Sequence, residues 1–341
     1  MTRTRTKTYR PIAFGIVTIV AVLVATLEAS AQQPSSSDQL NTLMSNRLEL
    51  SRRSVDDTLR RRLEDKKSDS TFPSDGRTTK AGVTRALSPE QQKAFQHNER
   101  GIQFFVKGKL DSAIKEYQEA IRFDPQLALA HNNLGSAYFS GSRFEEAAAE
   151  FQKASELDPN DGQAFFNLAL AQIKLGHEKE ANETLYAAIR AYNAAGEAHL
   201  RASRLKEAEE AFRGMFQIDP EYGPAFLQLG LMYNEAGRYD EAERNVRRVA
   251  DREPANAIAH AILAEALYGQ RKYEESITSA DRALKLSPKF PYAHYFAGLS
   301  CSSLGRREAA LDHLAQLQKL NSPEMAQRLS GFINTKAPAK Q

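Results

Sequence analysis

Residues 128–161, ALAHNNLGSAYFSGSRFEEAAAEFQKASELDPND, decide the fold, because the other ordered parts of the sequence are variants of this stretch. It holds two runs in which apolar side chains recur every three or four residues, a spacing that places them on one face of an α-helix. The first run contributes Leu134, Gly135 and Tyr138, and the second contributes Phe144, Ala147, Phe151 and Ala154. The stretch is therefore predicted to form a hairpin of two helices whose apolar faces meet.

Small residues and a proline define the geometry of this hairpin. Gly135 and Ala147 lack bulk at the level where the two helices must approach most closely. Asp158 stands directly before Pro159. Because proline disfavours helical geometry in the residue that precedes it, the second helix is predicted to end at this point.

The pattern resembles a tetratricopeptide repeat, a 34-residue unit with an aromatic residue, Leu-Gly, Tyr, Ala, Phe and Pro at fixed positions. The matching positions hold His131, Leu134, Gly135, Tyr138, Ala147, Phe151 and Pro159, so that only the first departs from the pattern. The resemblance implies an all-α fold, a right-handed α-solenoid of stacked hairpins. It also implies that a partner binds in a groove lined by the first helix of each hairpin, without specifying that partner.

The pattern recurs along the chain and predicts about seven hairpins, one of them degenerate. The units are 94–127, 128–161, 162 to about 188, a fourth from about 189, 223–256, 257–290 and 291 to about 324. Their closing prolines lie at 125, 159, 220, 254, 288 and 323, and the gap of 61 residues after 159 is seven residues short of two periods. We therefore predict an irregularity near 189–203, either a shortened helix or a continuous helix that two units share, which could divide the protein into two arms.

Both ends of the solenoid have sequence signals. Ser88 and Pro89 suit the N-cap and the first helical position, so the solenoid is predicted to begin at residue 88. At the other end, residues 323–335 are predicted to form a helix that caps the last apolar face. Its apolar stripe consists of Met325, Leu329, Phe332 and Ile333. The solenoid would then span 88–335, and 336–341 would be a disordered tail.

The first 31 residues have the layout of a secretory signal peptide. Four basic residues precede an apolar run at 12–27, and Ala29-Ser30-Ala31 follows it. The run is shorter than the roughly 20 residues that a spanning helix needs. We expect cleavage after Ala31 and a periplasmic or secreted protein. The alternative is an uncleaved helix that tethers the protein to the membrane.

The segment 32–87 is polar and is predicted to be a linker that contains one possible amphipathic helix at 38–67. The apolar stripe of that helix consists of Leu40, Leu43, Met44, Leu48, Val55, Leu59 and Leu63. A helix of this kind would dock weakly on the solenoid or self-associate. The oligomeric state does not follow from the sequence.

Composition excludes several classes of function. The chain of 341 residues has 46 basic and 43 acidic side chains. Removal of residues 1–31, which hold four basic residues and one acidic residue, leaves 42 of each. The excess positive charge therefore belongs to the export signal, and we expect neither nucleic-acid binding nor membrane insertion after cleavage.

No constellation of nucleophile, acid and base is recognisable, so we expect a protein that is not an enzyme and that needs no cofactor. Four of the seven histidines, His97, His131, His260 and His294, occupy the first position of the repeat pattern. Equivalent positions in adjacent units lie too far apart to share a zinc ion. These histidines are expected to pack between helices, and no metal site is predicted. Cys301 is expected to be a small buried residue.

The predicted binding site lies on the first helices. Amide side chains both donate and accept hydrogen bonds, which suits the backbone of an extended peptide, and aromatic rings suit apolar anchors. The candidate partner-binding residues are Asn98, Asn132, Asn133, Asn167, Gln228, Tyr268, Tyr292 and Tyr295. The alternative is an accessory or regulatory subunit of an envelope enzyme or of an export or assembly machine, which binds a glycan or a folded protein.

One better-defined activity of such repeats, the clamp that holds a C-terminal carboxylate, uses Lys, Asn, Asn, Lys and Arg. The matching positions hold Asn98, Ile102, Asn133, Gln163 and Asn167. Because both lysines and the arginine are missing, no charge is available for a terminal carboxylate, and this activity is not expected.

Cleavage of the signal peptide gives a direct test. Protein purified from its native host should have the intact mass of a chain that starts at Gln32. A mature chain that retains Met1 or Thr2 would instead indicate a membrane-tethered protein.

Overall fold

The computed structural model describes residues 88–335 of the chain. The predicted signal peptide at 1–31, the segment 32–87 with its possible helix at 38–67, and the predicted tail at 336–341 lie outside these residues. The described chain divides into two compact units, the first ending at Tyr192 and the second beginning at Asn193. Each unit is considered separately below.

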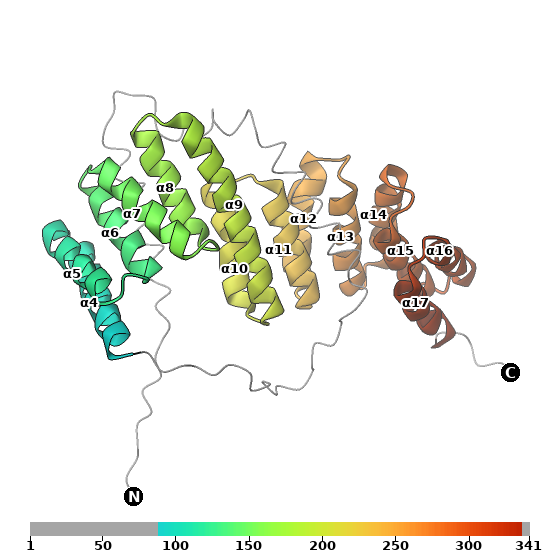
Figure 1. Cartoon of the computed structure of the whole chain (residues 1–341). Coiled ribbons are helices and arrows are strands. Elements are labelled where there is room, and N and C mark those ends of the chain that lie inside the picture. The colour runs from blue at the N-terminus through green and yellow to red at the C-terminus, as the bar shows by residue number, and fades with distance from the viewer. Residues whose placement is uncertain (1–87, 336–341) are drawn as a thin grey trace, which may run out of the picture. The chain divides into compact units, whose positions relative to one another are not determined.

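Residues 88–335 are all-α, as predicted, with 14 α-helices, one short 3-10 helix and no strand (Figure 1). The first unit contains α4 (Pro89–Val106), α5 (Leu110–Phe123), α6 (Ala128–Ser140), α7 (Phe144–Leu157), α8 (Gly162–Lys174) and most of α9 (Glu178–Arg201). The second contains the end of α9, α10 (Leu205–Gly214), η1 (Met215–Gln217), α11 (Gly223–Glu235), α12 (Tyr239–Arg252), α13 (Ala257–Gly269), α14 (Tyr273–Leu286), α15 (Pro291–Ser303), α16 (Arg307–Lys319) and α17 (Pro323–Thr335). These helices form the seven predicted hairpins and the capping helix of an α-solenoid.

Within a hairpin, a glycine of the first helix faces a ring of the second. A Cβ atom added to Gly135 would lie 2.7 Å from the ring of Phe151, which is closer than side chains tolerate. Gly101 has the same relation to Tyr117, at 2.4 Å. The predicted close approach is therefore confirmed, and glycine is needed there because the ring fills the space of its missing side chain.

The turns between paired helices share a feature that the sequence analysis did not identify. One residue in each turn has positive φ, a conformation that is costly for residues other than glycine. These residues are Gly108, Ser142, Gly176, Ser203, Gly237, Arg271 and Gly305, with φ from 56° to 78°. The interval from Gly176 to Ser203 is seven residues shorter than the other intervals, so the turns independently report the break in the period.

At the break, the chain forms one continuous helix instead of two. Helix α9 spans 24 residues, and its first part closes the third hairpin while its last part opens the fourth. This matches the second of the two alternatives for 189–203. The junction between the two units falls inside this helix, after Tyr192.

The two ends of the described chain avoid exposing an apolar face in different ways. In the second hairpin, the positions of α6 that are buried include Ala130, Leu134 and Ala137, which are at most 2% exposed. The equivalent residues of α4 are Gln96, Arg100 and Gln103, and all three are exposed. The first hairpin thus presents a polar outer face, as a terminal repeat must.

At the C-terminal end, α17 supplies the cover. It packs on both α15 and α16. Leu329 of α17 is fully buried, and a Cβ atom on Gly298 of α15 would lie 2.5 Å from its Cδ2 atom. The predicted role of residues 323–335 as a capping helix is therefore confirmed.

The ring of Phe151 gives a test of hairpin packing. Phe151→Ala should lower the free energy of unfolding by about 3–5 kcal/mol, because it empties the space against Gly135. Leu129→Ala in the same hairpin is the matched control, since Leu129 is 43% exposed and should cost less than about 0.5 kcal/mol. Urea denaturation measures both values. Equal losses in the two variants would contradict the packing described here.

Candidate functional site

All eight predicted site residues lie on first helices of hairpins, four in each unit. In the first unit, Asn98 lies on α4, Asn132 and Asn133 on α6, and Asn167 on α8. In the second unit, Gln228 lies on α11, Tyr268 on α13, and Tyr292 and Tyr295 on α15. The four residues of the first unit and the four residues of the second unit have different environments.

The asparagines of the first unit bind to each other across adjacent hairpins. Asn133 Nδ2 donates to Asn98 Oδ1 at 2.8 Å, and Asn167 Nδ2 donates to Asn132 Oδ1 at 3.0 Å. Both pairs are 35 residues apart, so each bond joins one hairpin to the next. We call these four side chains the amide ladder.

The amide ladder is buried and extends beyond its asparagines. Its members are between 1% and 9% exposed. Gln163 donates to Asn167 at 2.9 Å, and its own carbonyl oxygen accepts from the hydroxyl of Tyr192 at 3.1 Å. Burial raises the pKa of Tyr192, with a smaller contribution from Asp161, so the hydroxyl remains a donor.

These contacts change the interpretation of the asparagines. The prediction placed their amides on a surface open to peptide backbone, whereas the described structure uses them to join hairpins. A peptide would have to exchange with existing hydrogen bonds, and a buried amide left without a partner costs about 1–3 kcal/mol. A role for the asparagines in partner binding stays a prediction.

The second unit repeats the amide pairing once. Gln228 Nε2 donates to Asn193 Oδ1 at 2.8 Å, again across 35 residues. The sequence analysis did not predict Asn193 as a site residue, because the residue 34 positions before Gln228, at the same position of the repeat, is an alanine. The spacing of 35 residues back from Gln228 could have identified it.

Aromatic side chains gather on α13 and α15 around Phe296. Its ring centroid lies 4.9 Å from that of Tyr292, 5.2 Å from Tyr295 and 5.8 Å from Tyr268. We call Tyr268, Tyr292, Tyr295 and Phe296 the aromatic cluster. The sequence analysis predicted the three tyrosines as site residues but not the phenylalanine at their centre.

The tyrosines of the aromatic cluster are not equally accessible. Tyr292 is only 1% exposed, and its hydroxyl donates to Glu265, which also accepts from Asn234 Nδ2 at 3.0 Å. The expectation that Tyr292 presents aromatic surface is therefore corrected, because its ring is part of the core.

Tyr268 and Tyr295 are half-buried and keep part of their rings in contact with solvent. Burial raises the pKa of both phenols, so both stay uncharged at neutral pH. Rings of this kind, held by neighbours and partly open, are the aromatic anchors of many interfaces.

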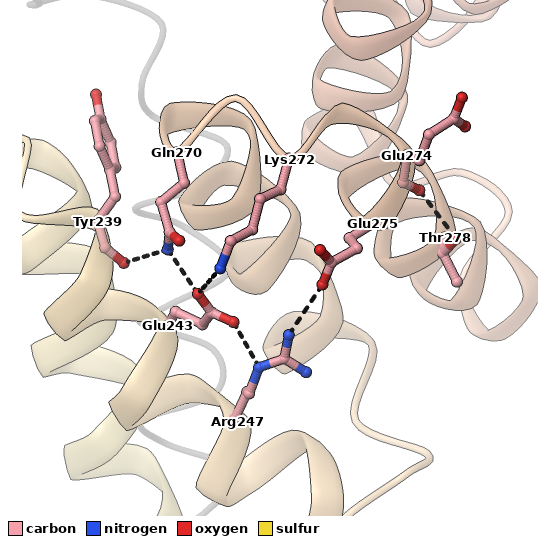
Figure 2. A network of polar contacts seen from close by, with 8 residues as sticks. All are labelled: Tyr239, Glu243, Arg247, Gln270, Lys272, Glu274, Glu275 and Thr278. Carbon is pink, nitrogen blue, oxygen red and sulfur yellow. Dashed lines mark hydrogen bonds and ion pairs between the residues drawn. The ribbon is translucent and has the colours of Figure 1, made fainter.

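A polar network of the second unit surrounds Glu243 of α12 (Figure 2). Arg247 Nε and Gln270 Nε2 each donate to its carboxylate at 2.7 Å, and Lys272 Nζ does so at 3.0 Å. Partial burial alone would raise the pKa of Glu243, but these three hydrogen bonds outweigh it and lower the pKa to about 2. Two of these hydrogen bonds join α12 to the turn that follows α13. We call Glu243 with Arg247, Gln270 and Lys272 the clasp.

The histidines serve a structural contact as well. Nε2 of His131, His260 and His294 faces the carbonyl oxygen of Pro125, Pro254 and Pro288 respectively, at 3.0 to 3.1 Å. Each contact joins a first helix to the proline that closes the preceding hairpin. The three rings are 2% to 8% exposed, in agreement with the expected packing between helices.

Residues 88–335 contain no group of three or more metal-ligating side chains. Within the same residues, no helix has the length and apolar character to cross a membrane. The thiol of Cys301 is buried, and burial raises its pKa, so it has little thiolate character.

Two family models of known proteins match the repeats of this chain. One family model, described as TPR repeat, matches residues 101–141 and 135–176. A second, described as tetratricopeptide repeat, matches 227–291 and 263–324. Together these matches cover half of the chain, in both units.

The individual proteins to which the chain is similar share low sequence identity with it or match only part of it. The chain is similar to anaphase-promoting complex subunit 3 of Schizosaccharomyces pombe, with 25% identity over 134 residues, and the match spans 39% of this chain and only 20% of that protein. A tetratricopeptide repeat protein from Parabacteroides merdae is 19% identical, with 71% of this chain and 99% of that chain covered and a TM-score of 0.38. The second repeat domain of Spaghetti (RPAP3), bound to an HSP90 peptide, is 31% identical over 30% of this chain and 94% of that chain, with a TM-score of 0.29.

The clasp around Glu243 gives a pH-dependent prediction. Glu243→Gln should lower the free energy of unfolding at pH 7 by roughly 1–3 kcal/mol, because it removes charge-assisted hydrogen bonds. Since the folded state lowers the pKa of Glu243, this contribution is complete above the ordinary pKa of 4.5 and is lost as the pH falls toward 2. The difference between the two proteins in urea denaturation should therefore be constant above about pH 5.5 and shrink below it.

Glu275→Gln is the matched control. Its side chain is 57% exposed and pairs with Arg247 at 3.4 Å, so it should change stability by less than about 0.5 kcal/mol. A Glu243→Gln effect as small as that of the control, or independent of pH, would contradict the assigned clasp.

Proposed function

Because the chain belongs to the tetratricopeptide repeat family, we propose that it is a non-catalytic scaffold of the cell envelope that binds a protein or an extended peptide. Repeats of this fold present side chains from successive first helices on one continuous surface, which suits interaction and requires no chemistry. The envelope location rests on the sequence of residues 1–31, with its basic start, its apolar run and Ala29-Ser30-Ala31.

The aromatic cluster carries the proposal for where binding occurs. Tyr268 and Tyr295 come from adjacent first helices and both contact Phe296, so their rings are held in place before a partner arrives. Anchors held in this way lose little side-chain entropy on binding. The occupant we propose is therefore a segment with apolar side chains that pack on these two rings.

The amide ladder contributes less in this proposal. Its asparagines are already bonded to each other, so the binding energy should come mainly from the aromatic cluster in the second unit. A carboxylate clamp of the kind excluded by the sequence is not part of the proposal, because the positions of its lysines and arginine hold Asn98, Gln163 and Asn167.

Site-specific crosslinking tests this function. A photo-crosslinking amino acid is placed at Tyr295 and, as the matched control, at Glu99, which lies exposed on the outer face of α4. Crosslinks formed in envelope extracts are identified by mass spectrometry. One or a few proteins enriched at Tyr295 and not at Glu99 would support the proposal, and a single stoichiometric enzyme among them would favour an accessory subunit. Equal labelling at the two positions would overturn it.

A double substitution then measures the contribution of the anchors. Tyr268→Ala combined with Tyr295→Ala should weaken binding of the crosslinked partner by about 2 kcal/mol or more, as the loss of aromatic hot spots does. Because the anchors are uncharged, raising the salt concentration should change the affinity only slightly. Calorimetry gives the affinities.

The matched control for this experiment is Tyr292→Phe. It removes the hydroxyl that donates to Glu265 but keeps a buried ring, so it should leave the affinity nearly unchanged. Circular dichroism establishes that each variant is folded. Unchanged affinity in the folded double variant would move the binding site away from the aromatic cluster.

A further inference from the structure

In three hairpins, the histidine of the first helix has a partner 19 residues later on the second helix. In the first two hairpins that partner is a glutamate. His97 Nδ1 lies 2.8 Å from Glu116 Oε2, and His131 Nδ1 lies 2.7 Å from Glu150 Oε2. In the last hairpin it is a second histidine, with His294 Nδ1 on α15 lying 3.1 Å from His313 Nδ1 on α16.

Hydrogen-bond acceptors determine where the protons lie. Nε2 of His131 faces the carbonyl oxygen of Pro125, and its Nδ1 faces a carboxylate. Both acceptors require an N–H donor, so this site accommodates the charged imidazolium. The two nitrogens of a histidine can both donate only in that form.

The last hairpin has the opposite requirement. Nε2 of His294 must donate to the carbonyl oxygen of Pro288, which leaves its Nδ1 as an acceptor in the neutral ring. His313 Nδ1 must then be the donor of the 3.1 Å bond. Two neutral rings satisfy this arrangement. If both rings took up an additional proton, the N–H groups at the two Nδ1 atoms would face each other.

The surroundings favour the neutral pair. Burial lowers the pKa of His294 and of His313, and for His313 the neighbouring His294 adds to the effect. Asp281 of α14 and Asp312 of α16 act in the opposite direction on His313 but do not reverse it. Gly298 of α15 lies next to the Cβ atom of His313. On the side of α17, Gly298 faces Leu329, which is an apolar side chain.

We propose that His294 and His313 form an acid-sensitive joint that loosens the last hairpin and its capping helix as the pH falls below about 6.5. The sign follows from linkage. Because the folded state favours the neutral rings, the unfolded chain takes up protons first on acidification. The contribution of the pair is therefore complete above the ordinary histidine pKa and is lost progressively below it. Since α17 packs on both α15 and α16, it should be released with them.

Hydrogen exchange of the full chain at pH 7.5 and 5.5, corrected for intrinsic rates, tests this joint. Protection of α15, α16 and α17 should fall by up to about tenfold for each histidine at pH 5.5, because one pH unit below the ordinary pKa of 6.5 favours the protonated ring of the opened chain by that factor. Protection of α4 to α7 should not fall, because His97 and His131 face glutamates there. A loss of equal size in both regions, or no loss in either, would overturn the proposal.

The variant His313→Glu gives the last hairpin the histidine–glutamate pair of the first two. It should abolish the acid-induced loss in α15 to α17 or reverse it, which removal of a merely structural ring would not do. If that variant fails to fold, His313→Gln supplies a donor that does not titrate and should reduce the loss, because only His294 then takes up a proton. Persistence of the full loss in a folded variant would assign the acid response to other groups.

Discussion

The close approach of the two helices in each hairpin is the constraint on which the rest of the structure depends. Gly101 against Tyr117, Gly135 against Phe151 and Gly196 against Phe212 repeat one contact in which a ring fills the space of a missing side chain. This contact sets the distance between paired helices. It thereby fixes which positions of a first helix face the adjacent hairpin, and the buried amide pairs use those positions.

The junctions between hairpins differ in chemistry although their geometry is shared. In the first unit, buried amides pair 35 residues apart, and they stabilise the junction only while both partners are present. In the second unit, ion pairs such as Arg306 with Glu274 and Arg238 with Glu209 link adjacent hairpins at the surface. Such exposed pairs contribute little individually, and the partly buried Glu243 is the exception because three donors converge on it.

The hairpins could be predicted from the sequence because helical periodicity, glycine and closing proline are local signals. The pairing of Asn98 with Asn133 could not, since a side-chain amide suits solvent, a peptide or another amide equally well. The burial of Tyr292 depends on its packing against the buried ring of Phe296 and on its hydrogen bond to Glu265 of the preceding hairpin, which no local pattern encodes. Ser142, Ser203 and Arg271 were also missed as turn residues because residues of these types seldom adopt positive φ.

A repeat determines where a side chain lies but not which residue type it is. The positions at which one hairpin departs from the common residue are therefore the informative ones. The position that holds Asn133 in α6 and Asn167 in α8 holds Ile262 in α13 and Phe296 in α15. With the amides gone, no polar pairing is needed at that junction, and Phe296 can gather Tyr268 and Tyr295 around itself. The same reasoning applies to His313, which stands where Glu116 and Glu150 stand in the first two hairpins. Both departures lie toward the C-terminal end of the second unit, where the proposed binding site and the proposed acid-sensitive histidine pair replace the polar contacts of the first hairpins.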